Sequence, residues 1–182
     1  MTRPKLHMIA SAHYAATFQT MTELYARGYR RIGFVFTRQH DQRTNHTHLA
    51  GYLTARELHD SHTNLPPFIN ETDDSSRSSL WRWFDRYKPD AIITGDRHFE
   101  QVLQERNLKA PDDIGLACPG LADATGTTAG ICEDNRQLGR IAADFLVAML
   151  HRGERGIPAR PQQLLVPGAW TSGRTLRPLP SD

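Results

Sequence analysis

The chain has 182 residues and a formal net charge of +2, because 22 basic side chains nearly match 20 acidic ones. This balance leaves no basic footprint for DNA, and a hydrophobic content of 38% excludes the disordered class. The length fits one well-packed domain with extensions.

The first predicted elements alternate between strand and helix. An apolar run over residues 5–10 predicts a strand, after which Ser11 is expected to cap a helix that ends at Gly28. The continuous apolar run 32–36 is typical of a strand buried on both faces of a parallel sheet. Residues 38–43 read as a polar loop.

The same alternation continues through the middle of the chain. Thr44 is expected to cap the next helix, and the pattern then predicts a strand at 68–69, a helix over 75–87, a strand at 91–94, a helix over 97–106 and a strand over 114–118. Regular alternation implies right-handed crossovers and a parallel sheet with helices on both faces. Such sheets bind ligands beyond the carboxyl ends of their strands, so the candidate site lies on the connecting loops there.

The last third of the chain changes character. The segment 130–132 is expected to cross between two lobes. Asp134 or Asn135 is expected to cap the clearest helix of the sequence, whose apolar stripe predicts a buried structural face. Residues 163–166 are predicted to form the final strand.

Several kinds of site are disfavoured by the motifs that are missing. There is no nucleophile elbow, phosphate loop or zincin motif, and the two cysteines have no zinc-finger or disulfide spacing. No signal peptide or membrane helix is recognisable, so a cytoplasmic protein without a membrane partner is expected.

The nine histidines raise the question of a metal site. The densest set is His40, His46, His48, His59 and His62. On a helix only positions three or four apart are neighbours, so His46 and His48 point to different faces. We therefore predict no metal and no other cofactor.

The acidic residues near predicted element ends have two interpretations. The pairs Asp73–Asp74 and Asp112–Asp113 suit caps and turns better than acid–base chemistry. Asp96 follows a strand directly, and for it a cap and a ligand contact remain equally open.

Four phrases, in this order, carry a family resemblance. They are MTELYARGYRRIGFVF at 21–36, HLAGY at 48–52, the stretch from PDAIITGD to APDDIGLACPG at 89–120, and TTAGICEDNRQLGRIAADFL at 127–146 followed by QQLLVPGAW. Together they resemble the effector-binding core of the LacI/GalR family of repressors over nearly all of residues 10–175.

The resemblance implies a type I fold like that of periplasmic binding proteins, with a C-terminal lobe plus a crossover helix from the other lobe. Residues 1–176 would form a partial effector-binding domain, with the second lobe at about 10–120 and 160–176, the crossover at about 128–153, and a frayed tail at 177–182. The family's helix-turn-helix headpiece and most of its first lobe have no counterpart in these residues.

The chain departs from the family at its ligand anchors. A family arginine that grips a sugar hydroxyl falls at His48, an asparagine falls at Gly95, and a late aspartate falls near Gly120. The effector is then either not a typical sugar or is held by other residues. The effector-binding candidates are Gln42, Thr44, His48, Asp96 and Asn135.

The resemblance implies the ligand-sensing and dimerisation part of a LacI-type transcription regulator rather than an enzyme. A small-molecule effector, a sugar or another metabolite, would bind between lobes and alter operator affinity, with DNA contacted only through a headpiece outside this chain. A homodimer is expected, with Phe99, Val102 and Arg106 as interface candidates. The alternatives are a transport-type solute-binding protein, an α/β enzyme using Asp96, His48 and Asp73, and a sensor that responds to a partner protein.

Overall fold

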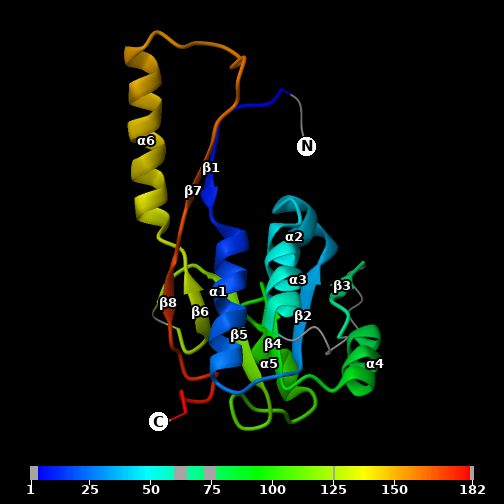
Figure 1. The fold of residues 1–182 in the computed structure, drawn as a ribbon. Coiled ribbons are helices and arrows are strands. Elements are labelled where there is room, and N and C mark those ends of the chain that lie inside the picture. The colour runs from blue at the N-terminus through cyan, green and yellow to red at the C-terminus, as the bar shows by residue number, and fades with distance from the viewer. Residues whose placement is uncertain (1–3, 60–64, 72–76, 125, 181–182) are drawn as a thin grey trace.

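The computed structural model describes residues 4–59, 65–71, 77–124 and 126–180. The elements are β1 (Met8–Ser11), α1 (His13–Ala26), β2 (Ile32–Thr37), α2 (Arg38–Arg43), α3 (Thr47–His59), β3 (Phe68–Asn70), α4 (Ser78–Tyr87), β4 (Ala91–Thr94), α5 (Phe99–Gln104), β5 (Gly115–Leu121), β6 (Ala129–Cys132), α6 (Asn135–His151), β7 (Gln163–Val166) and β8 (Ala169–Thr171). Figure 1 shows one lobe, from which β1, β7 and α6 extend to one side.

The lobe is built on a six-stranded sheet in the order β3-β2-β4-β5-β6-β8. All neighbouring pairs are parallel except β6 and β8, which run antiparallel. The predicted α/β fold with a mostly parallel sheet and helices on both faces is therefore confirmed.

The side chains of β2 explain why both faces are covered. Successive residues of a strand point to opposite faces. Phe34 and Phe36 pack in the hydrophobic cluster that includes α1 and α3, whereas Val35 packs in the cluster that includes α4 and α5. A strand buried on both sides reads as a continuous apolar run, which is why it was recognisable in the sequence.

The extension differs from the prediction for the long helix. Strand β1 pairs in parallel with β7 in a separate two-stranded sheet, and α6 lies beside them (Figure 1). No residue of α6 is buried, and Leu146, Val147 and Leu150 are 57%, 50% and 56% exposed. The expected buried face of this helix is thus wrong for the described residues, because they cover its apolar stripe only in part, for example where the ring of His7 contacts Phe145 at 5.3 Å.

Some element boundaries also differ. Residues 38–43, predicted as a loop, form α2, because Thr37 Oγ1 accepts a hydrogen bond from the backbone N–H of His40 at 3.2 Å and caps a helix with no apolar face. Thr44 ends α2 instead of capping α3, and Ser11 belongs to β1, so it does not cap α1.

The segment that was expected to cross between lobes joins the sheet. Strand β6 lies between β5 and β8, and the chain leaves the sheet only after Cys132. Asp134 then caps α6, accepting from the backbone N–H of Gln137 at 2.8 Å. The predicted start of α4 at residue 75 lies outside the described residues.

Candidate functional site

A cavity of about 280 Å³ opens at the carboxyl ends of β2, β4 and β5. Ligand sites of parallel α/β sheets form at this edge. We call it the histidine cavity, and it is lined by His13, Phe36, His40, Arg43, Thr44, His48, Gly95, Pro119, Gly120 and Glu133.

Three imidazole rings from three helices meet in this cavity. The ring centroid of His48, on α3, lies 4.7 Å from that of His13 on α1 and 5.5 Å from that of His40 on α2. The ring of Phe36 contacts both His40 and His48, at 5.0 and 5.3 Å. These four residues come from four different elements but form one compact aromatic cluster in the fold.

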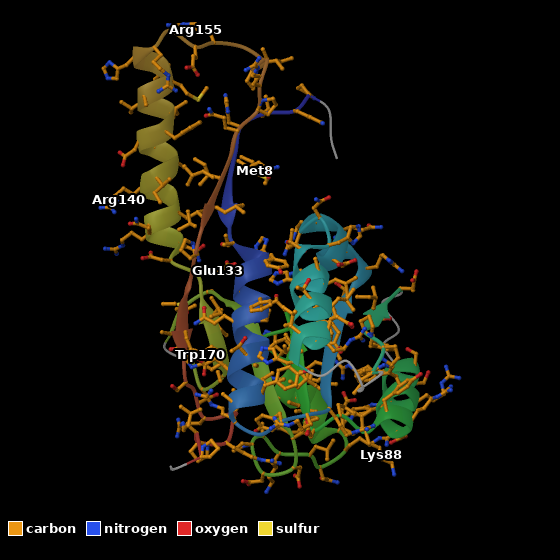
Figure 2. All side chains as sticks on the ribbon, viewed as in Figure 1. Met8, Lys88, Glu133, Arg140, Arg155 and Trp170 are labelled. Carbon is orange, nitrogen blue, oxygen red and sulfur yellow. The ribbon has the colours of Figure 1, made fainter. Side chains whose placement is uncertain are left out.

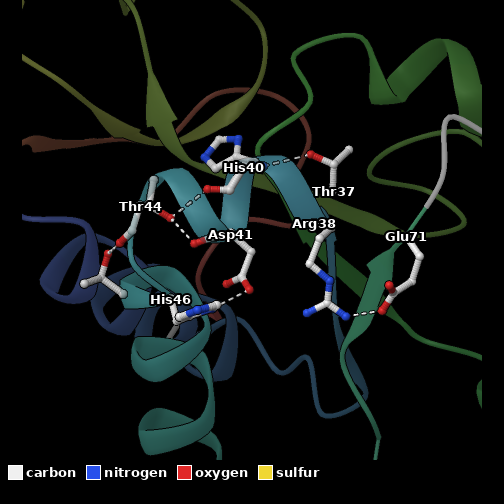
Figure 3. Close-up of polar contacts among 8 residues, drawn as sticks. Thr37, Arg38, His40, Asp41, Thr44, His46 and Glu71 are labelled. Carbon is white, nitrogen blue, oxygen red and sulfur yellow. Dashed lines mark hydrogen bonds and ion pairs between the residues drawn. The ribbon is translucent and has the colours of Figure 1, made fainter. Parts of the chain in front are cut away.

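The link between α2 and α3 fixes where His40 and His48 lie. Asp41 is 1% exposed, and its Oδ2 lies 2.6 Å from Nδ1 of His46 in the turn between the two helices (Figure 3). The hydroxyl of Thr44 donates to the backbone carbonyl of His40 at 3.0 Å. These contacts hold the last turn of α2 against the start of α3.

The hydrogen bonds of His48 allow a tautomer in which its Nε2 can accept from a ligand. Its Nδ1 lies 2.7 Å from the hydroxyl oxygen of Thr17, which itself donates to the carbonyl of His13 at 3.1 Å. A hydroxyl has one proton to donate. When that proton goes to the carbonyl, the hydroxyl accepts from Nδ1–H of His48, and Nε2 of His48 keeps a lone pair for a ligand.

The surroundings keep all three histidines neutral at ordinary pH. Burial, reinforced by His13 and His40, lowers the pKa of His48 to about 3. Burial is also the largest cause that lowers the pKa of His13 and of His40, and Arg43 pushes both in the same direction. Glu133 opposes this shift of the pKa at both rings.

Two charged side chains accompany the rings. Glu133 Oε1 lies 3.6 Å from Nε2 of His13. Figure 2 shows Glu133 where the chain passes from the lobe to α6. Arg43, the last residue of α2, is the only lining side chain with a fixed positive charge among the described residues of the cavity.

Two glycines make room for these side chains. A Cβ at Gly95 would lie 2.6 Å from Cε1 of His40, so the ring of His40 needs a glycine there. A Cβ at Gly120 would lie 3.5 Å from Oε1 of Glu133. The positions where the family resemblance places polar anchors, His48, Gly95 and Gly120, thus line one cavity, and His40 and Glu133 stand beside the two glycines.

A second cavity, of about 320 Å³, adjoins the first. Both are lined by Phe36, His40 and Gly95, and the second continues between β3, β4 and α5. Asp96 lines it, and its carboxylate also accepts from the backbone N–H of His98 at 2.9 Å. The N-cap position of α5 is His98, so Asp96 closes only the turn before that helix, and its contact with a ligand stays a prediction.

Of the other predicted effector-binding residues, two line the histidine cavity and two do not. Thr44 and His48 line the histidine cavity. Gln42 and Asn135 are exposed and lie outside the lining of both cavities. For these two, contact with an effector stays a prediction.

Of the three predicted dimer-interface residues, two are buried and one is exposed. Phe99 and Val102 are 4% and 3% exposed and pack in the core of the lobe, so they offer no surface to a second copy. Arg106 is on the surface, where it binds Asp85 at 2.9 Å and lies 4.8 Å over the ring of Trp81. Only Arg106 remains as an interface candidate.

The histidines of the dense sequence set take different partners. His46 contacts Asp41, His59 stacks on Tyr25, and His62 lies outside the described residues. Among the described residues no group of three or more metal-ligating side chains has the geometry to hold a metal ion. No helix in the described part is long and apolar enough to cross a membrane.

The residues of the enzyme alternative do not meet in the described chain. His48 lines the first cavity and Asp96 the second, and Asp73 lies outside the described residues. Sequence reasoning missed His13, His40, Arg43 and Glu133 as site residues. His13 could have been identified as a site residue from its place just after a predicted strand, which is the feature that pointed to Asp96.

Comparison with known proteins agrees with the fold of the chain. Residues 21–176 match the family model of the periplasmic binding protein-like domain. None of the curated proteins matches the chain in sequence.

Solved structures of transcription regulators share the fold. The regulator CcpA of Lactococcus lactis is 15% identical with a TM-score of 0.69, covering 93% of this chain and 64% of that one. A LacI family regulator from Enterococcus faecium with bound ribose is 12% identical with a TM-score of 0.74, covering 99% and 68%. The dimeric Lac repressor with an 11-residue C-terminal deletion is 18% identical with a TM-score of 0.71, covering 97% and 66%. The chain thus spans about two-thirds of these structures.

Proposed function

Because this chain belongs to the periplasmic binding protein-like domain family, we propose that it is the ligand-sensing and dimerisation part of a LacI-type transcription regulator. A small-molecule effector binds at the histidine cavity, between this lobe and a second lobe, and changes the affinity of the regulator for its operator. The observation that carries the proposal is a cavity at the carboxyl ends of parallel strands that collects His48, Gly95 and Gly120.

The extension supports a second lobe. The apolar side chains of α6 and β7 are exposed, among them Leu146, Leu150 and Leu165, the last at 55%. Exposed large apolar side chains on neighbouring elements are typical of an interaction surface. We propose that residues 1–176 are a partial effector-binding domain, and that this surface packs on the remainder of that domain.

Contact with DNA and the cellular setting belong to the same proposal. The formal charge of +2 is only a small positive excess for binding phosphates, and we propose that DNA is reached through another segment of the regulator. The regulators that share the fold support a cytoplasmic protein that is not an enzyme. A regulator with bound ribose and one in complex with cellobiose support a small-molecule effector.

Dimerisation follows from the symmetry of operators, which pair two half-sites with two copies of a regulator. The Lac repressor that shares the fold is dimeric. We propose a homodimer with Arg106 at or near the interface. Light scattering of the chain is expected to give the mass of two copies, and a purely monomeric result at high concentration would contradict this part.

A thermal-shift screen of sugars and other metabolites tests the sensing function. A ligand at about one hundred times its Kd stabilises the folded chain by about 2.7 kcal/mol, or about 5–10 °C at this size. Gly120→Leu is expected to abolish that shift, because the added side chain enters the cavity from a position with only ordinary contacts.

The matched control is Gly139→Leu on α6, where an added Cβ meets nothing within 4 Å. It is expected to keep the full ligand-induced shift. Metabolites that stabilise the Gly120→Leu variant as much as the unmodified chain would place binding elsewhere, and a screen without any stabilising compound would contradict the sensing function.

A further inference from the structure

We infer that the histidine cavity takes an acidic effector, a small organic acid that also carries a hydroxyl group, and that binding draws protons onto its histidines. The inference rests on the proposed function and names the class of ligand for the same site. It follows from the chemistry of the side chains that line the cavity and from their hydrogen bonds.

The charged side chains of the cavity lining are one cation and one carboxylate, which come from different segments of the chain. The cation is that of Arg43, and His13, His40 and His48 add imidazole nitrogens. Glu133 is the only carboxylate of that lining. A carboxylate accepts charge-assisted hydrogen bonds from guanidinium and imidazolium groups, which are about twice as strong as neutral ones. A sugar hydroxyl can also accept from Arg43, but it brings no opposite charge to the guanidinium.

Glu133 opposes an anion, but it lies beside His13 and not on α2 with Arg43. Its Oε1 lies 3.6 Å from Nε2 of His13, on the side of the cavity where the chain leaves for α6. Arg43 and His40 lie on α2 and approach the cavity from another element. A bound carboxylate therefore meets Arg43 and His40 first, with His13 shared between ligand and Glu133.

The hydroxyl requirement comes from His48. In the tautomer in which its Nδ1–H donates to the hydroxyl of Thr17, Nε2 is an acceptor without a proton. Inside a cavity a carboxylate would repel this lone pair, whereas a hydroxyl would donate to it. The cavity thus has a donor side at His40 and Arg43 and an acceptor side at His48.

Protonation on binding follows from the charges that face each ring. Burial and Arg43 disfavour the charged forms of His13 and His40, and His13 also disfavours the charged form of His40. Glu133 favours the charged form of both rings, and Asp41 favours that of His40. A bound anion adds an opposite charge beside both rings and raises their pKa. Binding therefore takes up protons, and affinity rises as the pH falls.

Isothermal titration calorimetry of the 182-residue chain tests the inference. The acids are D-glucuronate, malate and citrate, and the neutral partner is D-glucose, which differs from glucuronate only at C6. Titration at about pH 6 and about pH 8, in two buffers of different ionisation enthalpy, counts the protons taken up. We expect at least one acid to bind about tenfold more tightly at the lower pH, with proton uptake, and glucose to bind far more weakly.

Two variants localise the effect. His40→Asn is expected to reduce the proton uptake, and the exposed His151→Asn on α6 is the control that leaves it unchanged. Binding of acids without proton uptake, or binding of glucose with none of the acids, would overturn the inference. The sensing function would survive the second result, since it fails only if the wider metabolite screen finds no ligand at the cavity.

Discussion

Replacing Gly130 with alanine is expected to destabilise the chain by more than about 3 kcal/mol. Gly130 pairs with Cys118 between β6 and β5 and has a φ of 153°, a conformation that side chains rarely adopt. An alanine Cβ would lie 1.8 Å from the carbonyl oxygen of Cys118. Because the obstacle is backbone in a central strand pair, the two strands must move apart.

Separation of β5 from β6 would also disturb the histidine cavity. Strand β6 ends at Cys132, next to Glu133 of the histidine cavity. Urea unfolding of Gly130→Ala measures the loss of stability. Gly139→Ala, at an open position on α6, is the control and is expected to stabilise the helix by about 0.5–1 kcal/mol. A Gly130→Ala chain as stable as the unmodified one would contradict the packing of β5 on β6.

Acidification is the second change with a large expected effect. The pKa of His48 lies at about 3 in the folded chain, against an ordinary value of 6.5. As the pH falls, His48 takes up a proton in the unfolded chain before it does so in the folded chain. Its contribution to the free energy of unfolding is therefore complete above about pH 6.5 and is lost as the pH falls toward the folded pKa. Between about pH 6.5 and pH 4.5 the loss from His48 alone is about 2–3 kcal/mol.

The measurement is the free energy of unfolding across this range. His13 and His40 act in the same direction, because their pKa values are lowered as well. His48→Gln lowers stability at neutral pH but is expected to flatten the pH dependence, since glutamine does not titrate. His151→Gln, at the exposed end of α6, should leave the slope as it is. Equal slopes for the His48→Gln chain and the unmodified chain would show that His48 is not held neutral.

The fold was largely predictable because its strands are buried on both faces. The runs at 32–36 and 91–94 contain almost only apolar residues, and they form the centre of the sheet. Helix α2 was missed because it is short and polar, and its cap at Thr37 has no apolar periodicity behind it. The stripe of α6 was recognised, but a pattern of apolar residues does not say which surface covers them.

The site was only partly predictable, because a cavity depends on which elements meet. His48, Gly95 and Gly120 came from the family resemblance, and all three line the histidine cavity. His13 lies 35 residues before His48, and only the packing of α1 on α3 brings their rings to 4.7 Å. Gln42 lies two residues after His40 on α2, yet it points away from the cavity, since neighbours two apart on a helix face different directions.

The most direct test of the account is the crystal structure of this chain with the metabolite that stabilises it most. The account predicts that the compound occupies the histidine cavity, in contact with His48 and with Arg43 or His40. A compound bound instead in the 570 Å³ cavity between the end of α6 and the loop before β7, lined by His7, Phe145 and Arg155 among others, would contradict it.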